Sequence, residues 1–209
     1  MKIYLILLPI MFIGLGCAAS YNVGVNGYSS TGQSVSIPDE SSFAVVTDRD
    51  VPNPIFQKEV GTKIRKILTD MGYVGNVEQP DYYLLFDYGI DSGRSVTDAI
   101  PIYHRGYYYE HGFPSFHRHG YTTYIPYSSV IYTRWLVLKL FEGKAYAESK
   151  QAEPLWICEV ASAGVSSDLR ETINYLLVAA FEHLGQDTGR QISEVVLRDD
   201  ERVRALAEY

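Results

Sequence analysis

Two segments of the sequence carry a single apolar stripe at helical spacing, and this feature constrains the fold most strongly. The first segment lies between Asn53 and Gly72, and the second lies between Asp168 and Gly185. A helix with one apolar stripe is stable when that stripe packs against another element. The chain must therefore supply an apolar surface for both helices. The stripes consist of Phe56, Val60, Ile64, Ile67, Leu68 and Met71 in the first helix, and Leu169, Ile173, Leu176, Leu177, Ala180 and Leu184 in the second.

Both helices have recognisable ends. Asn53 is a suitable N-cap, Pro54 fits the first helical position, and Gly72 can adopt the left-handed conformation that ends a helix. In the second helix, Asp168 and Glu171 have the spacing of a capping box. These signals predict helices from about residue 54 to residue 71 and from about residue 169 to residue 184.

Four segments have the patterns of strands. Residues 43–46 form a short apolar run. In residues 81–90, one face of the expected strand is formed by Tyr82, Leu84, Phe86, Tyr88 and Ile90. Residues 134–141 and 155–163 are two further apolar segments separated by a glycine-containing turn, which indicates a hairpin. The order β-α-β-β-β-α predicts an α+β fold, in which a four-stranded, mostly antiparallel sheet carries both helices on one face.

The N-terminus has the pattern of a bacterial secretion signal. Lys2 gives a short positive start, and residues 3–15 are apolar or small throughout. This run is shorter than the roughly 20 residues that a membrane-spanning helix needs, so it indicates a signal peptide. Small residues precede Cys17, which resembles the lipobox of bacterial lipoproteins, although Gly14 stands where leucine is usual. The resemblance implies removal of residues 1–16 and acylation of Cys17, for example by palmitate.

The signal leaves one alternative open, because an ordinary signal peptidase could cut after Ala19 and release a soluble protein. With Cys17 as the anchor, Ala18 lacks the acidic character that retains lipoproteins in the inner membrane. We therefore expect a lipid-anchored protein of the outer membrane that faces the periplasm. The formal net charge of −7 argues against a nucleic-acid partner.

The remaining boundaries follow from composition. Residues 17–40 are rich in serine, glycine and asparagine, which predicts a flexible tether between the anchor and the domain. Residues 41–185 contain the predicted strands and helices and form the expected α+β domain. Residues 186–209 are highly charged and form a predicted C-terminal tail of unassigned role.

The order of these segments, together with the lipoprotein start, resembles the bacterial envelope lipoproteins of domain-of-unknown-function family forty-one thirty-six. The resemblance covers residues 41–185, including the strand at 43–46, the helix end at 70–73 and the run at 79–85. It extends to residues 135–141, to Leu155-Trp156 and to the second helix. The family implies an envelope lipoprotein with an α+β fold, and it supplies no established activity.

Residues 101–127 form an aromatic and histidine-rich insert between two predicted strands. They contain seven tyrosines, two phenylalanines and four of the five histidines of the chain. His117 and His119 would share one face of a strand, and His111 with Glu110 could complete a set of metal ligands. The spacing matches no known ligand motif, so the expectation is that the protein binds no metal or other cofactor.

Two other interpretations of the insert remain open. Tyrosine and phenylalanine supply large contact areas, so the insert could bind a partner. It could instead fold over the open face of the sheet and hide Tyr83, Leu85, Trp135 and Val137. The candidate partner surface consists of Tyr107, Tyr108, Tyr109, Phe113, Phe116, Tyr121 and Tyr124.

No other group of residues has the pattern of a catalytic site. Cys158 alternates with Trp156 and Val160, which predicts a buried and unreactive thiol. The sequence contains no glycine-rich phosphate loop and no HExxH or GxSxG motif. We therefore expect a non-enzymatic lipoprotein that binds or supports another envelope component, such as a protein or a cell-wall component. The alternative is a small metal-dependent hydrolase or metal-binding protein that uses the histidines of the insert.

Overall fold

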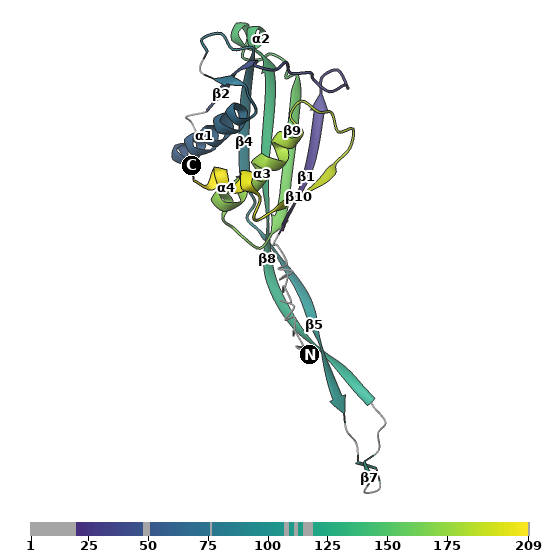
Figure 1. Cartoon of the computed structure of the whole chain (residues 1–209). Helices are drawn as coiled ribbons and strands as arrows, with labels where there is room; N and C mark the ends of the chain where they lie inside the picture. Colours follow the sequence, from purple (N-terminus) through teal and green to yellow (C-terminus); the bar gives the residue numbers. More distant parts are fainter. Residues whose placement is uncertain are drawn as a thin grey trace, which may run out of the picture.

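The computed structural model describes residues 20–47, 51–75, 77–106, 109–110, 113–114 and 119–208, with side chains outside residues 104–121. A large sheet carries helices on one face (Figure 1). Its strand order is β10 (Ile192–Leu197), β1 (Ser20–Ser29), β9 (Trp156–Gly164), β8 (His119–Glu142), β4 (Tyr82–Ile90), β2 (Ser42–Val46) and β3 (Val74–Gly75). An eighth strand, β5 (Arg94–Gly106), pairs with the first half of β8. The helices are α1 (Pro54–Asp70), α2 (Gly143–Glu148), α3 (Leu169–Glu182) and α4 (Glu201–Ala207).

The predicted sheet is wrong in its size and in part of its pairing, although the α+β class is correct. The sheet has eight strands rather than four, and it is mixed because β2 runs parallel to both β3 and β4. The predicted hairpin of the last two strands is present as the antiparallel pair of β8 and β9. Strand β2 is parallel to β3 because α1 lies between them in the sequence and returns the chain to the end of the sheet at which β2 begins. A separate short pair, β6 (Tyr109–Glu110) with β7 (Phe113–Pro114), lies outside this sheet.

The predicted tether at residues 17–40 is wrong for residues 20–29, because these residues form β1 between β9 and β10. Val23 and Val25 alternate with polar residues and are fully buried. Gly27 reflects close packing, since a Cβ atom there would lie 2.2 Å from the carbonyl oxygen of Gln186. The backbone of Gly27 instead exchanges hydrogen bonds with Thr188. The folded domain therefore starts at Ser20 and not at residue 41.

The predicted end of the domain at residue 185 is also wrong. Strand β10 pairs with β1, and α4 packs against α3. Three apolar side chains among the charges of this segment, Val196, Val203 and Leu206, are buried in the core. The charged residues occupy the solvent side of these short elements, and their number hid the apolar pattern in the sequence.

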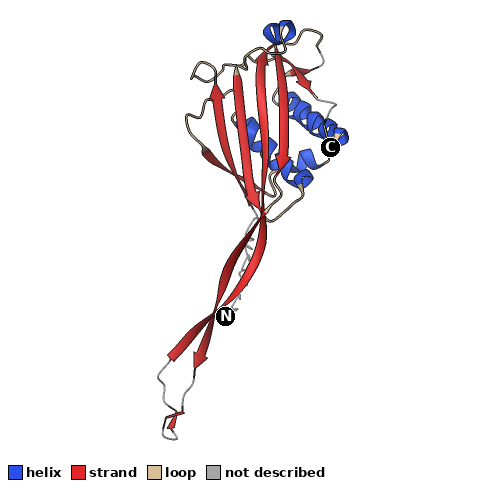
Figure 2. Cartoon of the chain, turned by 180° about the vertical axis from the view of Figure 1, so that it is seen from behind, coloured by secondary structure: helices blue, strands red, loops and turns tan. Residues whose placement is uncertain are grey.

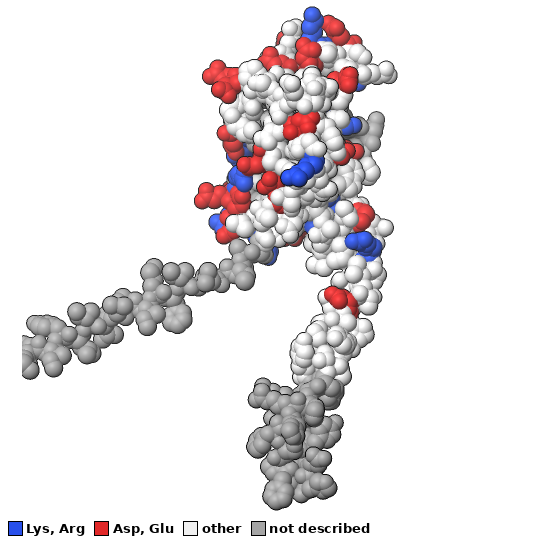
Figure 3. Space-filling view, turned by 90° about the vertical axis from the view of Figure 1, so that its right-hand side faces the viewer, with Lys and Arg blue, Asp and Glu red and all other residues white. Residues whose placement is uncertain are grey.

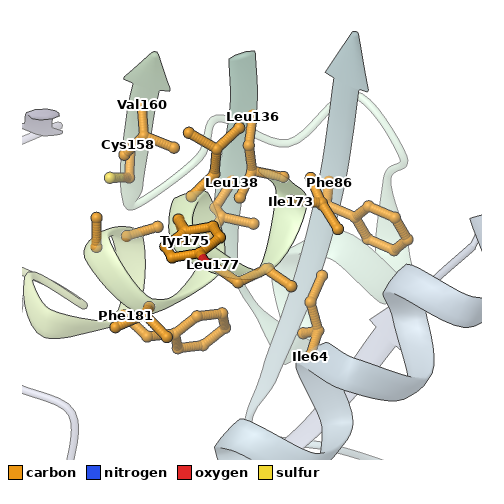
Figure 4. Packing of buried hydrophobic residues seen from close by; sticks show 14 of the residues in the cluster. Ile64, Phe86, Leu136, Leu138, Cys158, Val160, Ile173, Tyr175, Leu177 and Phe181 are labelled. Carbon is orange, nitrogen blue, oxygen red and sulfur yellow. The ribbon is translucent and has the colours of Figure 1, made fainter. Parts of the chain in front are cut away.

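The core lies between the helices and one face of the sheet (Figure 4). Ile64 of α1, Leu176 of α3 and Leu136 of β8 belong to this one cluster, and each of the three is fully buried. The predicted helix ends are confirmed: the side chains of Asn53 and Asp168 accept hydrogen bonds from the first turns of α1 and α3. The two glycines that follow these helices have positive φ angles.

We expect Ile64→Asp and Leu176→Asp each to unfold the domain. Each change places an unpaired charge in the core, which costs about 4 kcal/mol or more of the free energy of unfolding. Urea denaturation followed by circular dichroism measures this loss. Ile55→Asp is the matched control, because Ile55 is 81% exposed and an acid in the first turn of α1 is favourable. A melting curve of Ile64→Asp that matches the wild type would contradict the assigned core.

Candidate functional site

A two-stranded antiparallel ribbon projects from one end of the sheet and is the most distinctive feature of the surface (Figures 1 and 2). It is formed by β5 and the first half of β8, whose pairing runs from Arg94 opposite Ile131 to Gly106 opposite His119. At about 3.4 Å per residue, these pairs extend roughly 40 Å. We use the name ribbon for residues 94–103 and 122–131, where the side chains are described.

The root of the ribbon is fixed to the sheet by backbone hydrogen bonds. The N–H of Asp91 donates to the carbonyl oxygen of Thr133 at 3.0 Å, and the N–H of Thr133 donates to the carboxylate of Asp91 at 2.9 Å. This second bond, with one from the N–H of Gly93, holds the pKa of the Asp91 carboxyl below its usual value. Gly93 has a φ of +76°, which lets the chain turn between β4 and β5. Both strands therefore leave the sheet at one defined point.

Arg134 is buried at the same root. Its Nη1 donates to the carbonyl oxygen of Ser166 at 3.1 Å, and its Nη2 donates to the hydroxyl of Ser162 at 3.2 Å. Within the described part of the chain, its Nε has no hydrogen-bond partner. Burial lowers the pKa of this guanidinium. The contacts tie β8 to β9 and to the loop that follows β9, so they stiffen the point from which the ribbon leaves.

The side chains of the ribbon are exposed and almost uncharged. Its two charged residues are Arg94 at the root and Asp98 about halfway along the described pairs. Figure 3 shows the charges gathered on the body of the protein, while the outer part of the described ribbon is white. Ile100 is 53% exposed, and Tyr103 and Tyr124 are 80% and 67% exposed. An exposed surface of this kind on a folded domain is typical of an interaction site.

Two prolines interrupt the free edges of the ribbon. Pro101 lies opposite Tyr124, and Pro126 lies opposite Ala99, so the two pairs are of the same kind in the antiparallel ladder. Because proline has no N–H to give to the ladder, both nitrogens must face outward. Each outer edge therefore lacks one N–H donor, at Pro101 on β5 and at Pro126 on β8, which disfavours the addition of another strand. The faces of the ribbon, and not its edges, are its candidate binding surface.

The predicted partner surface coincides in part with this ribbon. Tyr124 lies on β8 and is exposed. Tyr109, Phe113 and Tyr121 lie in strands, but their side chains are outside the described set. The other members, Tyr107, Tyr108 and Phe116, lie outside the described residues. The sequence analysis assigned the candidate surface to part of this segment, but it did not predict the two-stranded form of the segment or its extension toward Arg94 and Ile131.

The interpretation of the insert as a cover for the sheet is wrong for β5 and β8, because they extend away from the body. Figure 2 shows the face of the sheet opposite the helices without a layer over it. Tyr83 and Trp135 on this face are half-buried by near neighbours. The ring of Tyr83 packs on that of Tyr146 in α2 at 4.8 Å, and Trp135 lies against the backbone of Gly89, where a Cβ atom would be 2.5 Å from the indole ring.

The side chains of the candidate metal ligands are not among those that the structure describes. His111 and His117 lie outside the described residues, and the side chains of Glu110 and His119 are not described although they lie in strands. Among the side chains that the structure describes, no three histidine, cysteine or acidic residues are close enough to hold a metal ion. The lipidation candidate, Cys17, also lies outside the described residues.

Sequence reasoning did not find a buried polar cluster between α1 and α3. Lys63 is almost fully buried and contacts Glu59 at 3.3 Å and the Asn174 Oδ1 atom at 2.9 Å. Arg170 contacts the other carboxylate oxygen of Glu59 at 2.7 Å. Burial would raise the pKa of Glu59, but the hydrogen bonds from Arg170 and Lys63 outweigh it, and the pKa is lowered. Because every member has a partner, the cluster joins the two helices and does not have the properties of a catalytic site.

Cys158 is fully buried on β9, as the sequence predicted. Burial raises the pKa of this thiol to about 12. A thiol reacts as its thiolate, so the folded protein should protect Cys158 from modification.

We expect Cys158 to be unreactive in the folded protein and fully reactive after unfolding. Titration of the Cys17→Ser variant with a disulfide reagent near pH 8 measures this directly. The unfolded thiol ionises at a pKa of about 8.5, so its contribution to stability is complete below that pH and falls as the pH rises toward about 12. Rapid reaction of the folded variant would contradict the assigned burial.

Comparisons with known proteins add little to this geometry. No family model matches the chain, and no curated protein matches it. A solved structure described as a PDZ domain protein from Parabacteroides distasonis is similar to it, with a TM-score of 0.46 and 14% sequence identity. The match covers 84% of this chain and 39% of that chain. No helix within the described residues is long and apolar enough to cross a membrane.

Proposed function

We propose that this protein is an envelope lipoprotein, anchored through acylated Cys17, whose domain binds another component of the envelope through the ribbon. The anchor is supported by the apolar run of residues 3–15 and the small residues before Cys17. The resemblance to envelope lipoproteins of family forty-one thirty-six supports the same compartment. Residue 18 is alanine and not an acidic residue, which favours the outer membrane over the inner membrane.

The observation that carries the binding role is the exposed, nearly uncharged ribbon. A two-stranded hairpin is at best marginally stable in water when it stands alone. Here the root holds it to the sheet, while side chains such as Ile100 and Ile125 stay more than half exposed. This arrangement keeps apolar surface in water at a cost to solubility. A contact that covers the exposed apolar side chains of the ribbon removes that cost.

A binding role also fits the grooves of the body better than an enzymatic role does. A groove of about 580 Å³ between α1, α3 and α4 is lined by apolar side chains, including Ile67 and Phe181. The charged residues at its rim include Glu182 and Arg202, which pair with each other. Among the described residues that line this groove, no nucleophile stands beside a general base, which acyl transfer or hydrolysis by the protein's own side chains would need.

The anchor is tested by the mass of the intact protein extracted from membranes. We expect a chain that begins at Cys17 and carries additional acyl mass. Cys17→Ser should abolish both the acyl mass and membrane attachment, whereas the control Cys158→Ala should keep both. Recovery of a soluble wild-type chain that begins at Ser20 would contradict the anchor.

The ribbon is tested by shortening it. Because Arg94 and Ile131 are paired, an Asn-Gly turn can join them in place of residues 95–130. We expect this variant to melt within a few degrees of the wild type, because the removed side chains lie outside the core. A photoreactive amino acid at Tyr124 should form crosslinks in intact cells, and one at Ala147, at the other end of the sheet, should not. Equal crosslinking at both positions would contradict a binding role for the ribbon.

A further inference from the structure

The first described residue of the chain lies at the root of the ribbon. Strand β1 begins at Ser20, which pairs with Leu197 of β10. Gly24 pairs with Ala161 of β9, and β9 continues to Gly164, which pairs with Tyr132 beside the root. The start of β1 and the departure of the ribbon therefore share one end of the sheet (Figure 1).

This position limits the distance between the domain and the anchor. Ser20 is three positions after Cys17 in the chain, and a fully extended chain spans at most about 3.6 Å per residue. The Cα atoms of Cys17 and Ser20 are thus no more than about 11 Å apart. Because residues 20–29 are held in the sheet, they do not lengthen the connection between the anchor and the domain. An acyl group on Cys17 would keep the root of the ribbon within about one headgroup layer of the bilayer.

We infer that the ribbon lies against the surface of the bilayer that holds the acylated Cys17. This inference rests on the proposed anchor and names the envelope component that the ribbon contacts. The body of the domain extends from the root in the direction opposite to the ribbon (Figure 2). An orientation that pointed the ribbon away from the bilayer would therefore push the charged body into it.

The chemistry of the ribbon fits a lipid surface. Its two charged residues are Arg94 at the root and Asp98 about halfway along the described pairs, and residues 99–103 and 122–127 carry no charge. Ile100 and Ile125 are directly paired, share one face and are about half exposed. Tyrosine favours the boundary between headgroups and acyl chains. Tyr127 is exposed on the same face as Ile100, whereas the exposed Tyr103 and Tyr124 lie on the opposite face. The contact is apolar, so it needs no anionic lipid.

The outer edges of the ribbon determine how deeply the ribbon can enter the bilayer. Two strands that pair only with each other leave N–H and C=O groups without a strand partner along both outer edges. Each such group costs several kcal/mol in hydrocarbon, so a single ribbon does not cross the bilayer core. At the interface these groups keep their hydrogen bonds to water and headgroups. The ribbon therefore lies along the surface with the Ile100–Ile125 face toward the acyl chains.

Fluorescence of a labelled ribbon in vesicles tests the contact. The acylated full-length protein carries Ile100→Cys, labelled with an environment-sensitive fluorophore, in phosphatidylcholine vesicles. Buried Cys158 does not compete for the label. We expect a blue shift of emission and strong quenching when the acyl chains of the lipid are brominated. Two controls should stay close to their values in water: Ala99→Cys, the neighbouring residue on the other face, and Ala147→Cys, at the far end of the sheet.

A second substitution links the signal to the apolar face. Ile125→Asp, in the protein labelled at residue 100, should reduce the quenching severalfold, because Ile125 is the partner of residue 100. Ser128→Asp, on the opposite face, should leave it unchanged. Both positions are exposed or lie outside the core, so neither change should unfold the domain.

The outcomes separate the inference from the anchor. A protein that floats with the vesicles, while its label at residue 100 stays water-exposed, overturns the ribbon contact and leaves the anchor intact. A label that is shielded in native membranes and exposed in phosphatidylcholine vesicles indicates a protein partner and also overturns the contact. A protein that carries no acyl mass and does not float overturns both the anchor and the contact that depends on it.

Discussion

The rest of the structure depends on the continuous pairing of β8, a strand of 24 residues that belongs to both the body and the ribbon. Its second half pairs with β4 on one side and with β9 on the other, from Tyr132 to Glu142. Its first half has a single partner, β5. Because one uninterrupted strand runs through both parts, the core that fixes Leu136, Leu138 and Leu140 also fixes the direction of the ribbon. The helices contribute indirectly, since they cover the face of the sheet that holds β8 in place.

The two main helices are joined by polar as well as apolar contacts. The Glu59 carboxylate forms ion pairs with Lys63 of its own helix and with Arg170 of α3. A buried lysine without such partners would be costly, because burial penalises its charge. Asn174 completes the set by accepting a hydrogen bond from Lys63. The cluster favours one alignment of α1 on α3, whereas apolar contacts alone would tolerate neighbouring ones.

The sequence allowed the core to be predicted where periodicity and end signals agree, as in α1 and α3. It did not reveal β1, because Asn22, Gly24 and Asn26 alternate with Val23 and Val25 and resemble a linker. It did not reveal the first half of β8, because an exposed ribbon has no buried face and thus no clear alternation. Pairing partners far apart in the chain, such as Ser20 and Leu197, leave no local signal. The candidate site was located by its tyrosines, but its shape depends on pairing that composition does not encode.

The outward-facing nitrogens of Pro101 and Pro126 have a consequence for the behaviour of the protein at high concentration. Exposed strands with apolar side chains are templates for stacking into fibrils, in which each new strand adds through its backbone. One missing donor on each margin interrupts that row of hydrogen bonds, so the addition of another copy side by side is disfavoured. The two prolines thereby lower the tendency of an apolar hairpin in water to polymerise.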